Sequence, residues 1–410
     1  MANSFRKYNA RKDRKSVQRI WRECGWITDE KREIEALDQF VKVSSGWVFD
    51  IDGSAESLSL STSSRFLHTK TELALAAITS VTTSRVARNQ RAASGTVSRL
   101  LAEQASAGAQ VSGLGIFEQG FYDRLGYGNG PYEHWVRFDP AWLIDLGKPR
   151  VPVRLCAADW KEIHEARLNR RKRHGAVDLL PAQVTKSEME WHKNTFGLGY
   201  REHGTLTHFF VAHCDGVESG PYIIDWMVYQ SIGQFKELLA LIRGLGDQVR
   251  HLRMREPRDI QLQSLMCKPF QLFQITANTK NQSRASAVAY WQQRILDLPA
   301  CVAAVSTATP CEFNLALADP IEDQLPEDAP WRGCGGEYII AFGSTSFATP
   351  GHAPGLPTLS ASVNDFTRFW MGAAGAEVLA GVGSFDGPAD LMIGLDESLR
   401  LPPPAPDWDY

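Results

Sequence analysis

Hydrophobic and polar positions along the chain fall into three successive blocks of similar length. In the first block, helical periodicity marks residues 16–23 and 93–107, and a short helix is expected over residues 120–125. Strand-like runs cover residues 46–51, 57–62, 73–83, 110–117 and 134–138. A succession of helix, antiparallel strands and then strand–helix–strand predicts an α+β unit.

The second block repeats the first in outline. It follows a break near residues 146–153, where Gly147 and two prolines interrupt the pattern. Helices are expected over residues 159–173, 182–193 and 232–245, and strands over residues 205–213, 222–229 and 251–254. The apolar run 223–228 feeds a helix as the centre of the first block does, but without a long loop in between.

The third block begins near residue 288 and ends in a proline-rich tail. The expected elements are strands over residues 301–306, 312–319, 337–342 and 358–363, an acidic loop over residues 320–330, a helix over residues 364–371 and a second helix before Gly381. The prolines extend the tail, yet it ends on Trp408 and Tyr410, whose side chains favour burial. The three blocks predict domains over residues 1–150, 151–287 and 288–410.

Composition supports a folded protein of several domains. The chain has 410 residues, of which 43% are hydrophobic, and a formal net charge of −3. One hydrophobic core rarely supports a chain of this length. The hydrophobic content excludes disorder as the dominant state, and the balanced charge gives no overall reason to expect a nucleic-acid or membrane-surface protein.

The seven cysteines indicate reduced thiols. They are scattered, with no CxxC pair and no Cys/His spacing that suits tetrahedral zinc, so we expect a cytoplasmic protein with no metal site. Residues 1–16 are polar and basic, unlike a secretory signal, and the apolar stretch 73–78 is far too short to cross a membrane.

Two basic runs stand out against the balanced total. One covers residues 6–19, and the other covers residues 170–173 at the end of an expected amphipathic helix. Basic residues in the last turn of a helix suit its dipole, and Gly175 follows as a stop signal. We therefore expect both runs to be solvated helix faces; contact with phosphates is the alternative.

Residues 81–94 contain the first candidate chemistry, because a strand ends there, a short turn follows and a helix begins. Backbone N–H groups at a helix start are unpaired and the dipole is positive there, so this junction can hold a pyrophosphate. Arg88 and Arg91 add positive charge for the same anion. Such junctions are also common as purely structural features, so this stretch alone does not define a function.

A second informative stretch, residues 117–128, follows one helix and one strand later. It contains the pairs Phe121-Tyr122 and Gly126-Tyr127. Here the sequence resembles the GNAT acetyltransferases, whose phosphate loop reads Arg/Gln-x-x-Gly-x-Gly/Ala and whose later strand is followed by an aromatic-Tyr and a Gly-aromatic pair. More narrowly, nearly the whole chain resembles the Eis-type acetyltransferases. This implies tandem GNAT-like domains with mixed, mainly antiparallel sheets, the second degenerate, followed by a sterol-carrier-like α+β domain.

The resemblance implies an N-acetyltransferase that uses acetyl-CoA and acts on a primary amine. Main-chain groups of Val81, Thr82 and Thr83 would pair with the pantetheine arm as an added strand does. The pyrophosphate would lie against the following loop and helix start, at Arg88, Asn89, Gln90, Arg91, Ala92, Ala93 and Ser94. Phe117 and Glu118 would lie beside the thioester.

By the same resemblance, the catalytic groups fall on two tyrosines. Tyr122 matches the tyrosine that protonates the departing thiolate, and the family's C-terminal carboxylate, here that of Tyr410, is the general base. A proton acceptor is needed because an amine attacks a thioester only when it is unprotonated. Trp408 and Tyr410 would hold the chain end in a cleft, where Asp409 would favour a cationic amine. The family also implies a homo-oligomer, specifically a hexamer.

One residue departs from the family pattern, since Arg91 stands where the phosphate loop has glycine. A side chain at this point could obstruct the pyrophosphate. Two alternatives therefore stay open. One is a non-catalytic protein that binds an apolar ligand in the third block, and the other is a DNA-associated regulator that uses the basic N-terminus.

Overall fold

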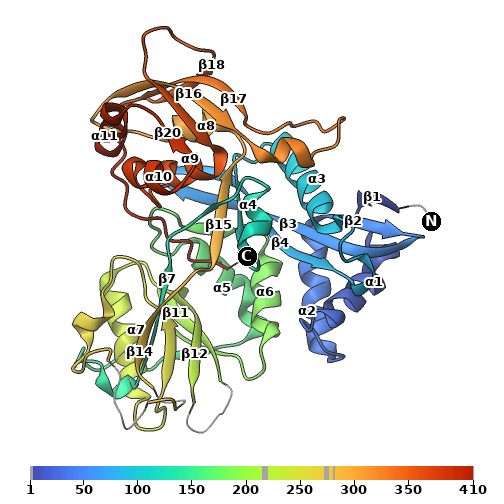
Figure 1. Cartoon of the computed structure of the whole chain (residues 1–410). Coiled ribbons are helices and arrows are strands. Elements are labelled where there is room, and N and C mark those ends of the chain that lie inside the picture. Colours follow the sequence, from blue (N-terminus) through green and yellow to red (C-terminus); the bar gives the residue numbers. More distant parts are fainter. Residues whose placement is uncertain (1–2, 215–219, 272–276, 280–281, 410) are drawn as a thin grey trace.

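The computed structural model describes residues 3–214, 220–271, 277–279 and 282–409 (Figure 1). These residues form three β-sheets with helices packed on them, so the expected α+β plan is confirmed. In the view of Figure 1 the third unit lies at the top and the second at the bottom, with the first sheet between them and to the right.

The first sheet has the strand order β1-β2-β3-β4-β5-β15-β6, with β9 beside β3. Its strands are antiparallel except for the pair β4 and β5, which is parallel. The strands are β1 (Asn3–Lys7), β2 (Ser45–Ile51), β3 (Ser54–His68), β4 (Thr71–Thr83), β5 (Val111–Gly115), β6 (Gly128–Asn129), β9 (Val177–Leu179) and β15 (Trp291–Ile295). The helices of this unit are α1 (Ala10–Glu23), α2 (Lys31–Lys42), α3 (Ala92–Ser106) and α4 (Gln119–Asp123).

The second sheet follows a similar plan, with the order β14-β7-β13-β12-β11-β10-β8 and one parallel pair, β12 and β13. Its strands are β7 (Glu133–Phe138), β8 (Val153–Leu155), β10 (Phe196–Glu202), β11 (Thr205–Cys214), β12 (Tyr222–Val228), β13 (Leu252–Arg255) and β14 (Arg284–Val288). The helices are α5 (Trp160–Leu168), α6 (Ala182–Trp191) and α7 (Ile232–Gly244). In both sheets, antiparallel strands lead to a parallel pair.

Three strands, β7, β9 and β15, pair outside the domains expected from the sequence. β9 follows residue 150 but pairs with β3 of the first sheet. β7 precedes residue 150 but pairs with β13 and β14 of the second sheet. β15 follows residue 287 but lies between β5 and β6 of the first sheet. The boundaries at residues 150 and 287 therefore do not separate the sheets, because the first and the second sheet each include at least one strand from outside the corresponding block of sequence.

The third sheet has the order β18-β17-β16-β19-β20. Its strands are β16 (Cys311–Ala318), β17 (Gly336–Phe342), β18 (Phe347–Pro350), β19 (Thr358–Ser362) and β20 (Phe385–Asp386). The helices are α8 (Leu298–Ala303), α9 (Val363–Trp370), α10 (Ala376–Val382) and α11 (Ala389–Ser398). The likeness of this unit to sterol carriers stays a prediction.

The third unit docks on the first through α9. The side-chain amide of Asn364 donates to the backbone oxygens of Asp123 and Tyr127, both at 2.8 Å. A Cβ at Gly128 would lie 2.3 Å from the backbone oxygen of Asn364, so only glycine permits this approach. The glycine-rich turn of the sequence therefore joins the first and third units.

The expected strand over residues 301–306 is wrong, because helix α8 occupies the start of that stretch. The carboxylate of Asp297 accepts from the N–H of Ala300 at 3.0 Å and caps the helix. Pro299 in the first turn also suits a helix start. The capping signals thus outweigh the short apolar run that suggested a strand.

The interpretation of the basic runs as solvated helix faces is wrong for residues 170–173, whereas on α1 the side chains of Arg11, Lys12, Arg14 and Lys15 are exposed as expected. Helix α5 ends at Leu168, so residues 170–173 lie beyond it, and Arg170 is buried 2.8 Å from the carboxylate of Asp178. In the N-terminal run, ion pairs within the protein engage Arg6, Lys7, Lys12, Arg14 and Arg19. Much of this positive charge is therefore paired within the protein, on exposed side chains whose ion pairs contribute little to stability.

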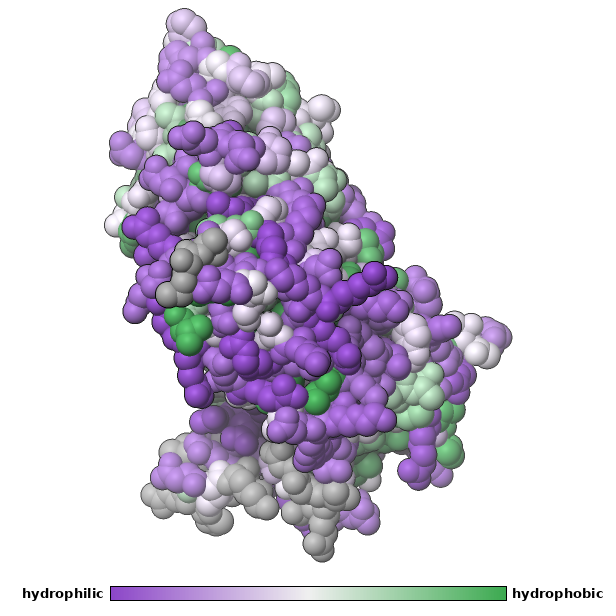
Figure 2. Space-filling model, turned by 90° about the vertical axis from the view of Figure 1, so that its right-hand side faces the viewer, coloured by the Kyte–Doolittle hydropathy of each residue, from purple (hydrophilic) through white to green (hydrophobic). Residues whose placement is uncertain are grey.

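The surface and the thiols agree with the composition. Hydrophilic residues cover most of the face in Figure 2, and the hydrophobic ones stand in small separate groups. All seven cysteines are free thiols, as expected. Among the described residues, none of the helices combines the length and the apolarity that a membrane crossing requires.

Candidate active site

The first sheet opens where its parallel strands diverge. The pairing of β4 with β5 ends at Ile78, while β4 continues to Thr83. At the same place the pairing of β4 with β3 shifts by one residue between Leu58 and Leu60. Ser80 lies in this bulge with a left-handed backbone, φ 55°. A bulge changes the direction of a strand. Here the bulge lies where β4 begins to extend beyond its pairing with β5.

The expected pantetheine-binding residues lie on that extension of β4; they are Val81, Thr82 and Thr83. Because β4 continues past the end of its pairing with β5, its backbone groups there can pair with an extended ligand in the manner of an added strand. The structure therefore places these residues where strand addition is geometrically open.

The loop after β4 leads directly into the N-terminus of α3. The expected pyrophosphate residues Arg88, Asn89, Gln90 and Arg91 are exposed in this loop, and Ala92, Ala93 and Ser94 form the first turn of the helix. Asn89 and Arg91 both have a left-handed backbone conformation, with φ 61° and 55°. Residues in this conformation before a helix can turn successive backbone N–H groups to the same side. The arrangement suits an anion.

Arg91 is the N-cap residue of α3 and has φ 55° and ψ 21°. Glycine adopts this conformation without steric cost, whereas arginine does not. The Arg91 side chain makes no capping hydrogen bond and is exposed. The departure from the family pattern therefore strains the backbone, while the side chain reaches solvent.

Tyr122 lies on the short helix α4 and is 5% exposed. Its ring packs edge-on against Phe121 and Tyr127, with centroids 4.9 and 6.0 Å away. Burial, and to a lesser extent the charge of Glu118, raises the pKa of its hydroxyl to about 12. The hydroxyl therefore stays protonated at neutral pH and is available as a donor.

Phe117 and Glu118 lie between β5 and α4, and both are exposed. The Glu118 carboxylate caps α4 by accepting from the N–H of Phe121 at 2.6 Å. Phe117 is 88% exposed, which is unusual for a phenylalanine. A ligand bound at the end of β5 would cover this ring.

Each of three consecutive tail residues is held by an arginine. Asp407 accepts from Arg170 at 2.7 and 2.5 Å, the guanidinium of Arg167 lies 3.6 Å from the ring centroid of Trp408, and Asp409 pairs with Arg255. Trp408 is 2% exposed, and its indole donates to Glu188 at 3.0 Å. The tail is therefore docked, and Trp408 is its buried anchor.

The next residue, Tyr410, lies outside the described residues. Its assignment as general base therefore stays a prediction. The position of Asp409 is nonetheless informative, because this residue lines a cavity between the first two units.

This acceptor cavity, as we call it, has a volume of ≈ 450 Å³. Aromatic rings from both units form much of its wall: Trp21, Trp26, Phe40, Trp191, Trp226 and Tyr290. Its carboxylates are those of Glu188, Asp225 and Asp409. Thr79 and Ser80 of the β4 bulge also line it, so the cavity reaches the opening of the first sheet. Aromatic faces and carboxylates both attract cations.

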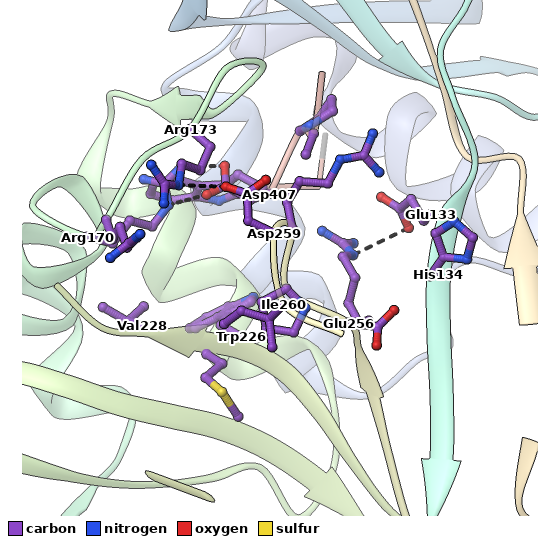
Figure 3. Close-up of a pocket in the computed structure, with 18 of the residues that line it drawn as sticks. Glu133, His134, Arg170, Arg173, Trp226, Val228, Glu256, Asp259, Ile260 and Asp407 are labelled. Carbon is purple, nitrogen blue, oxygen red and sulfur yellow. Dashed lines mark hydrogen bonds and ion pairs between the residues drawn. The ribbon is translucent and has the colours of Figure 1, made fainter. Parts of the chain in front are cut away.

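A second cavity, of ≈ 300 Å³, lies against the tail and is drawn in Figure 3. Residues of the tail line it together with these arginines: Arg167, Arg170, Arg171, Arg173, Arg255 and Arg258. Several are already paired, as Figure 3 shows for the contacts to Asp407 and Glu133. Three of them, Arg167, Arg170 and Arg255, hold the tail.

Glu133 in this second cavity has an unusual protonation equilibrium. Burial is the main cause that raises the pKa of its carboxyl to about 7. The negative charge of Asp409 also raises this pKa, whereas the positive charge of Arg255 lowers it. Its Oε2 lies 3.3 Å from the Arg255 guanidinium. The charge balance beside the tail therefore changes near neutral pH.

Apart from Asp409, the residues of the acceptor cavity were not predicted from the sequence. Trp21, Trp191 and Trp226 belong to elements far apart along the chain, and no spacing links them. One signal was available, since Asp225 interrupts the apolar run 223–228. A carboxylate in a strand of this kind needs a polar partner or a cleft.

Comparison with known proteins gives structural matches only. No family model matches the sequence, and no curated protein matches it. The chain is similar over 100% of its length to a protein from Enterococcus faecalis V583 described as a probable N-acyltransferase, with 17% identity, 100% of that chain covered and a TM-score of 0.81.

Two further structures are similar over 100% of this chain. One is a GCN5-related N-acetyltransferase from Kribbella flavida, with 17% identity, 99% of that chain covered and a TM-score of 0.76. The other is Eis1 from Mycobacterium abscessus, with 15% identity, 100% of that chain covered and a TM-score of 0.76. Because the matches span complete chains, they include all three units. The chain therefore has the fold of the Eis-type GNAT acetyltransferases, as the sequence resemblance implied.

Proposed function

We propose that the protein is an acetyl-CoA-dependent N-acetyltransferase that acts on a primary amine. The observation that carries the proposal is the opening of the first sheet at the β4 bulge, which is also an end of the acceptor cavity. Acetyl-CoA would lie along the extension of β4 with its pyrophosphate at the start of α3. The amine would arrive through the cavity, so that the two reactants meet at the bulge.

The proposed reaction is a direct transfer. The amine nitrogen attacks the thioester carbonyl carbon, the C–S bond breaks, and the products are an amide and CoA with a free thiol. Tyr122 donates its proton toward the departing sulfur, and the proton lost by nitrogen goes to the carboxylate of Tyr410. An α-carboxylate is a weak base, with a pKa of about 3.3–3.7, unless burial raises it, so the docked tail supports this role.

The acceptor cavity favours a cationic amine, such as a polyamine, an aminoglycoside-like molecule or a lysine side chain. The aromatic rings around it offer cation–π contacts worth about 0.5–2 kcal/mol each. Of the nearby carboxylates, Asp409 is paired with Arg255, whereas Asp225 pairs with a histidine.

The test combines a calorimetric titration with acetyl-CoA and a thiol-release assay with polyamines, aminoglycosides and lysine peptides. For Tyr122→Phe we expect unchanged acetyl-CoA affinity and a kcat lower by about 10²–10⁴-fold, because the leaving thiolate loses its proton donor. Failure of acetyl-CoA to bind at millimolar concentration would contradict the proposed function.

Tyr127→Phe is the matched control. The Tyr127 hydroxyl is fully buried and hydrogen-bonded to the Ser112 hydroxyl at 2.7 Å, so its loss should cost about 1 kcal/mol of stability and leave kcat near that of the wild type. If both variants lose turnover equally, Tyr122 does not have the role assigned to it.

The proposal includes the finer expectations of a cytoplasmic homo-oligomer, specifically a hexamer, with a sterol-carrier-like third unit. The same experiments bear on the alternative of a non-catalytic binding protein. Co-purified lipid together with no affinity for CoA would favour that alternative.

A further inference from the structure

The second sheet has its own opening, which corresponds to that of the first sheet. β12 pairs in parallel with β13 only up to Ile223, and its pairing with β11 then shifts by one residue, which leaves Asp225 as the extra residue of a bulge. In β4 the parallel pairing ends at Ile78 and the bulge contains Ser80. Asp225 and Ser80 thus occupy equivalent positions in the two related sheets.

Two histidines meet the Asp225 carboxylate at this opening. Nδ1 of His213, on β11, lies 2.9 and 3.0 Å from the two carboxylate oxygens. The His192 ring, at the end of α6, stacks on the His213 ring with centroids 4.1 Å apart and an interplanar angle of 13°. One ligand atom from each of the three residues lies within 4.8 Å of the other two.

We propose that His192, His213 and Asp225 form a binding site for a divalent transition-metal ion, with zinc as the principal candidate. Two imidazoles and one carboxylate are a ligand set that zinc accepts, and zinc sites with three protein ligands keep a fourth position open. His192 and Asp225 both line the acceptor cavity, so the open position faces that cavity.

The geometry suits capture of an ion with small side-chain movements. Zinc–ligand distances are about 2.0–2.2 Å, so ligand atoms around one ion lie closer together than 4.8 Å, and rotation of the exposed His192 can close the difference. The side chains of His213 and Asp225 are 13% and 21% exposed, which holds them in place while leaving access. No spacing in the sequence indicates this site, because the three ligands come from separate elements.

An ion at this site would join the end of α6 to strands β11 and β12. Because it would bind the folded state only, it should raise the melting temperature as its concentration increases. This effect does not depend on acetyl transfer, so the metal site and the proposed function can fail separately.

The test uses the full-length protein after treatment with a chelator. We expect calorimetric titration with Zn²⁺ to give one ion per chain, a higher melting temperature, and with Co²⁺ a visible absorption spectrum typical of a protein-bound ion. His213→Asn and Asp225→Asn should each lower Zn²⁺ affinity by about tenfold or more. His192→Gln, at an exposed position where misfolding is not a concern, should do the same.

His203→Gln is the matched control, because His203 is an exposed histidine of the same unit in the turn between β10 and β11. It should leave the affinity for Zn²⁺ unchanged. The proposal is overturned if the wild type binds no stoichiometric Zn²⁺, or if the three ligand variants bind it as tightly as the wild type.

Discussion

At the scale of single residues, burial sets the protonation states that matter around the candidate site. The buried hydroxyl of Tyr122 stays protonated, with a pKa of about 12, and this suits a donor. The carboxyl of Glu133 has a pKa of about 7, and its Oε1 is buried with no hydrogen-bond partner among the described residues. In both groups desolvation disfavours the charged form.

The raised pKa of Glu133 predicts a pH-dependent stability. A carboxyl whose pKa is about 4.5 unfolded and about 7 folded stabilises the native state at low pH, and this contribution is lost as the pH rises from 4.5 to 7. In Glu133→Gln that loss should disappear. Chemical denaturation at pH 5 and pH 8 measures this effect. Between the two pH values, the free energy of unfolding of Glu133→Gln should fall by about 2–3 kcal/mol less than that of the wild type.

Glu165→Gln serves as the control, because Glu165 is exposed on α5. It should reproduce the wild-type difference between the two pH values. A Glu133→Gln variant with an unchanged pH dependence would show that Glu133 is not the group responsible.

At the scale of elements, the sequence predicted those parts of the site that are continuous along the chain. Periodicity located β4, α3 and α7 to within a few residues, and the tyrosine motif located α4. Elements with weak local signals were missed. The N-cap residue of helix α2, Glu30, makes no side-chain capping hydrogen bond. Strand β10 contains Gly197 and Gly199, which allow close packing on neighbouring strands but obscure a strand pattern.

The cavities could not be predicted, for a different physical reason. Their walls exist only after the first two units pack, and the strand exchange of β7 and β9 that joins these units has no local signature. The bulge residue Asp225 was visible as a charge within an apolar run, but its histidine partners come from β11 and the end of α6. Local patterns therefore indicate the cofactor side of the site better than the acceptor side.

The junction between β4 and α3 predicts the effect of restoring the glycine of the family pattern. Left-handed backbone at Arg91 costs about 1–2 kcal/mol, whereas glycine loses about 0.5–1 kcal/mol more chain entropy on folding than other residues. Arg91→Gly should therefore raise the free energy of unfolding slightly, by up to about 1 kcal/mol. Urea denaturation at neutral pH measures this change.

Ala93→Gly provides the comparison, because Ala93 lies in the first turn of α3. There glycine has no strain to relieve and should lower the stability by about 0.5–1 kcal/mol. Destabilisation of equal size in both variants would mean that Arg91 is not strained.

At the scale of the whole molecule, the tail connects the three units. It leaves the third unit after α11, and all three arginines that hold it come from the second unit: Arg167, Arg170 and Arg255. The residue that follows Trp408 lines a cavity shared with the first unit. The third unit thus supplies the tail, and the second unit holds it beside the cavity that the first unit shares.

This division of roles predicts that the tail affects turnover and not cofactor binding. Deletion of residues 407–410 should abolish thiol release while leaving acetyl-CoA affinity unchanged, because the residues proposed to bind the pantetheine arm and the pyrophosphate lie on β4 and at the start of α3. Asp407→Asn removes a charged acceptor whose hydrogen bonds to Arg170 are worth about 1.5–3 kcal/mol. The tail should then detach more often, and kcat should fall by about tenfold.

Asp390→Asn is the control for Asp407→Asn, because Asp390 is an exposed aspartate on α11 of the third unit. It should leave kcat unchanged. Calorimetry with acetyl-CoA separates the two ways in which the variants can fail. If the deletion also removes acetyl-CoA binding, the tail supports the fold of the first unit. If the deletion leaves kcat unchanged, the carboxylate of Tyr410 is not the group that accepts the proton from the amine.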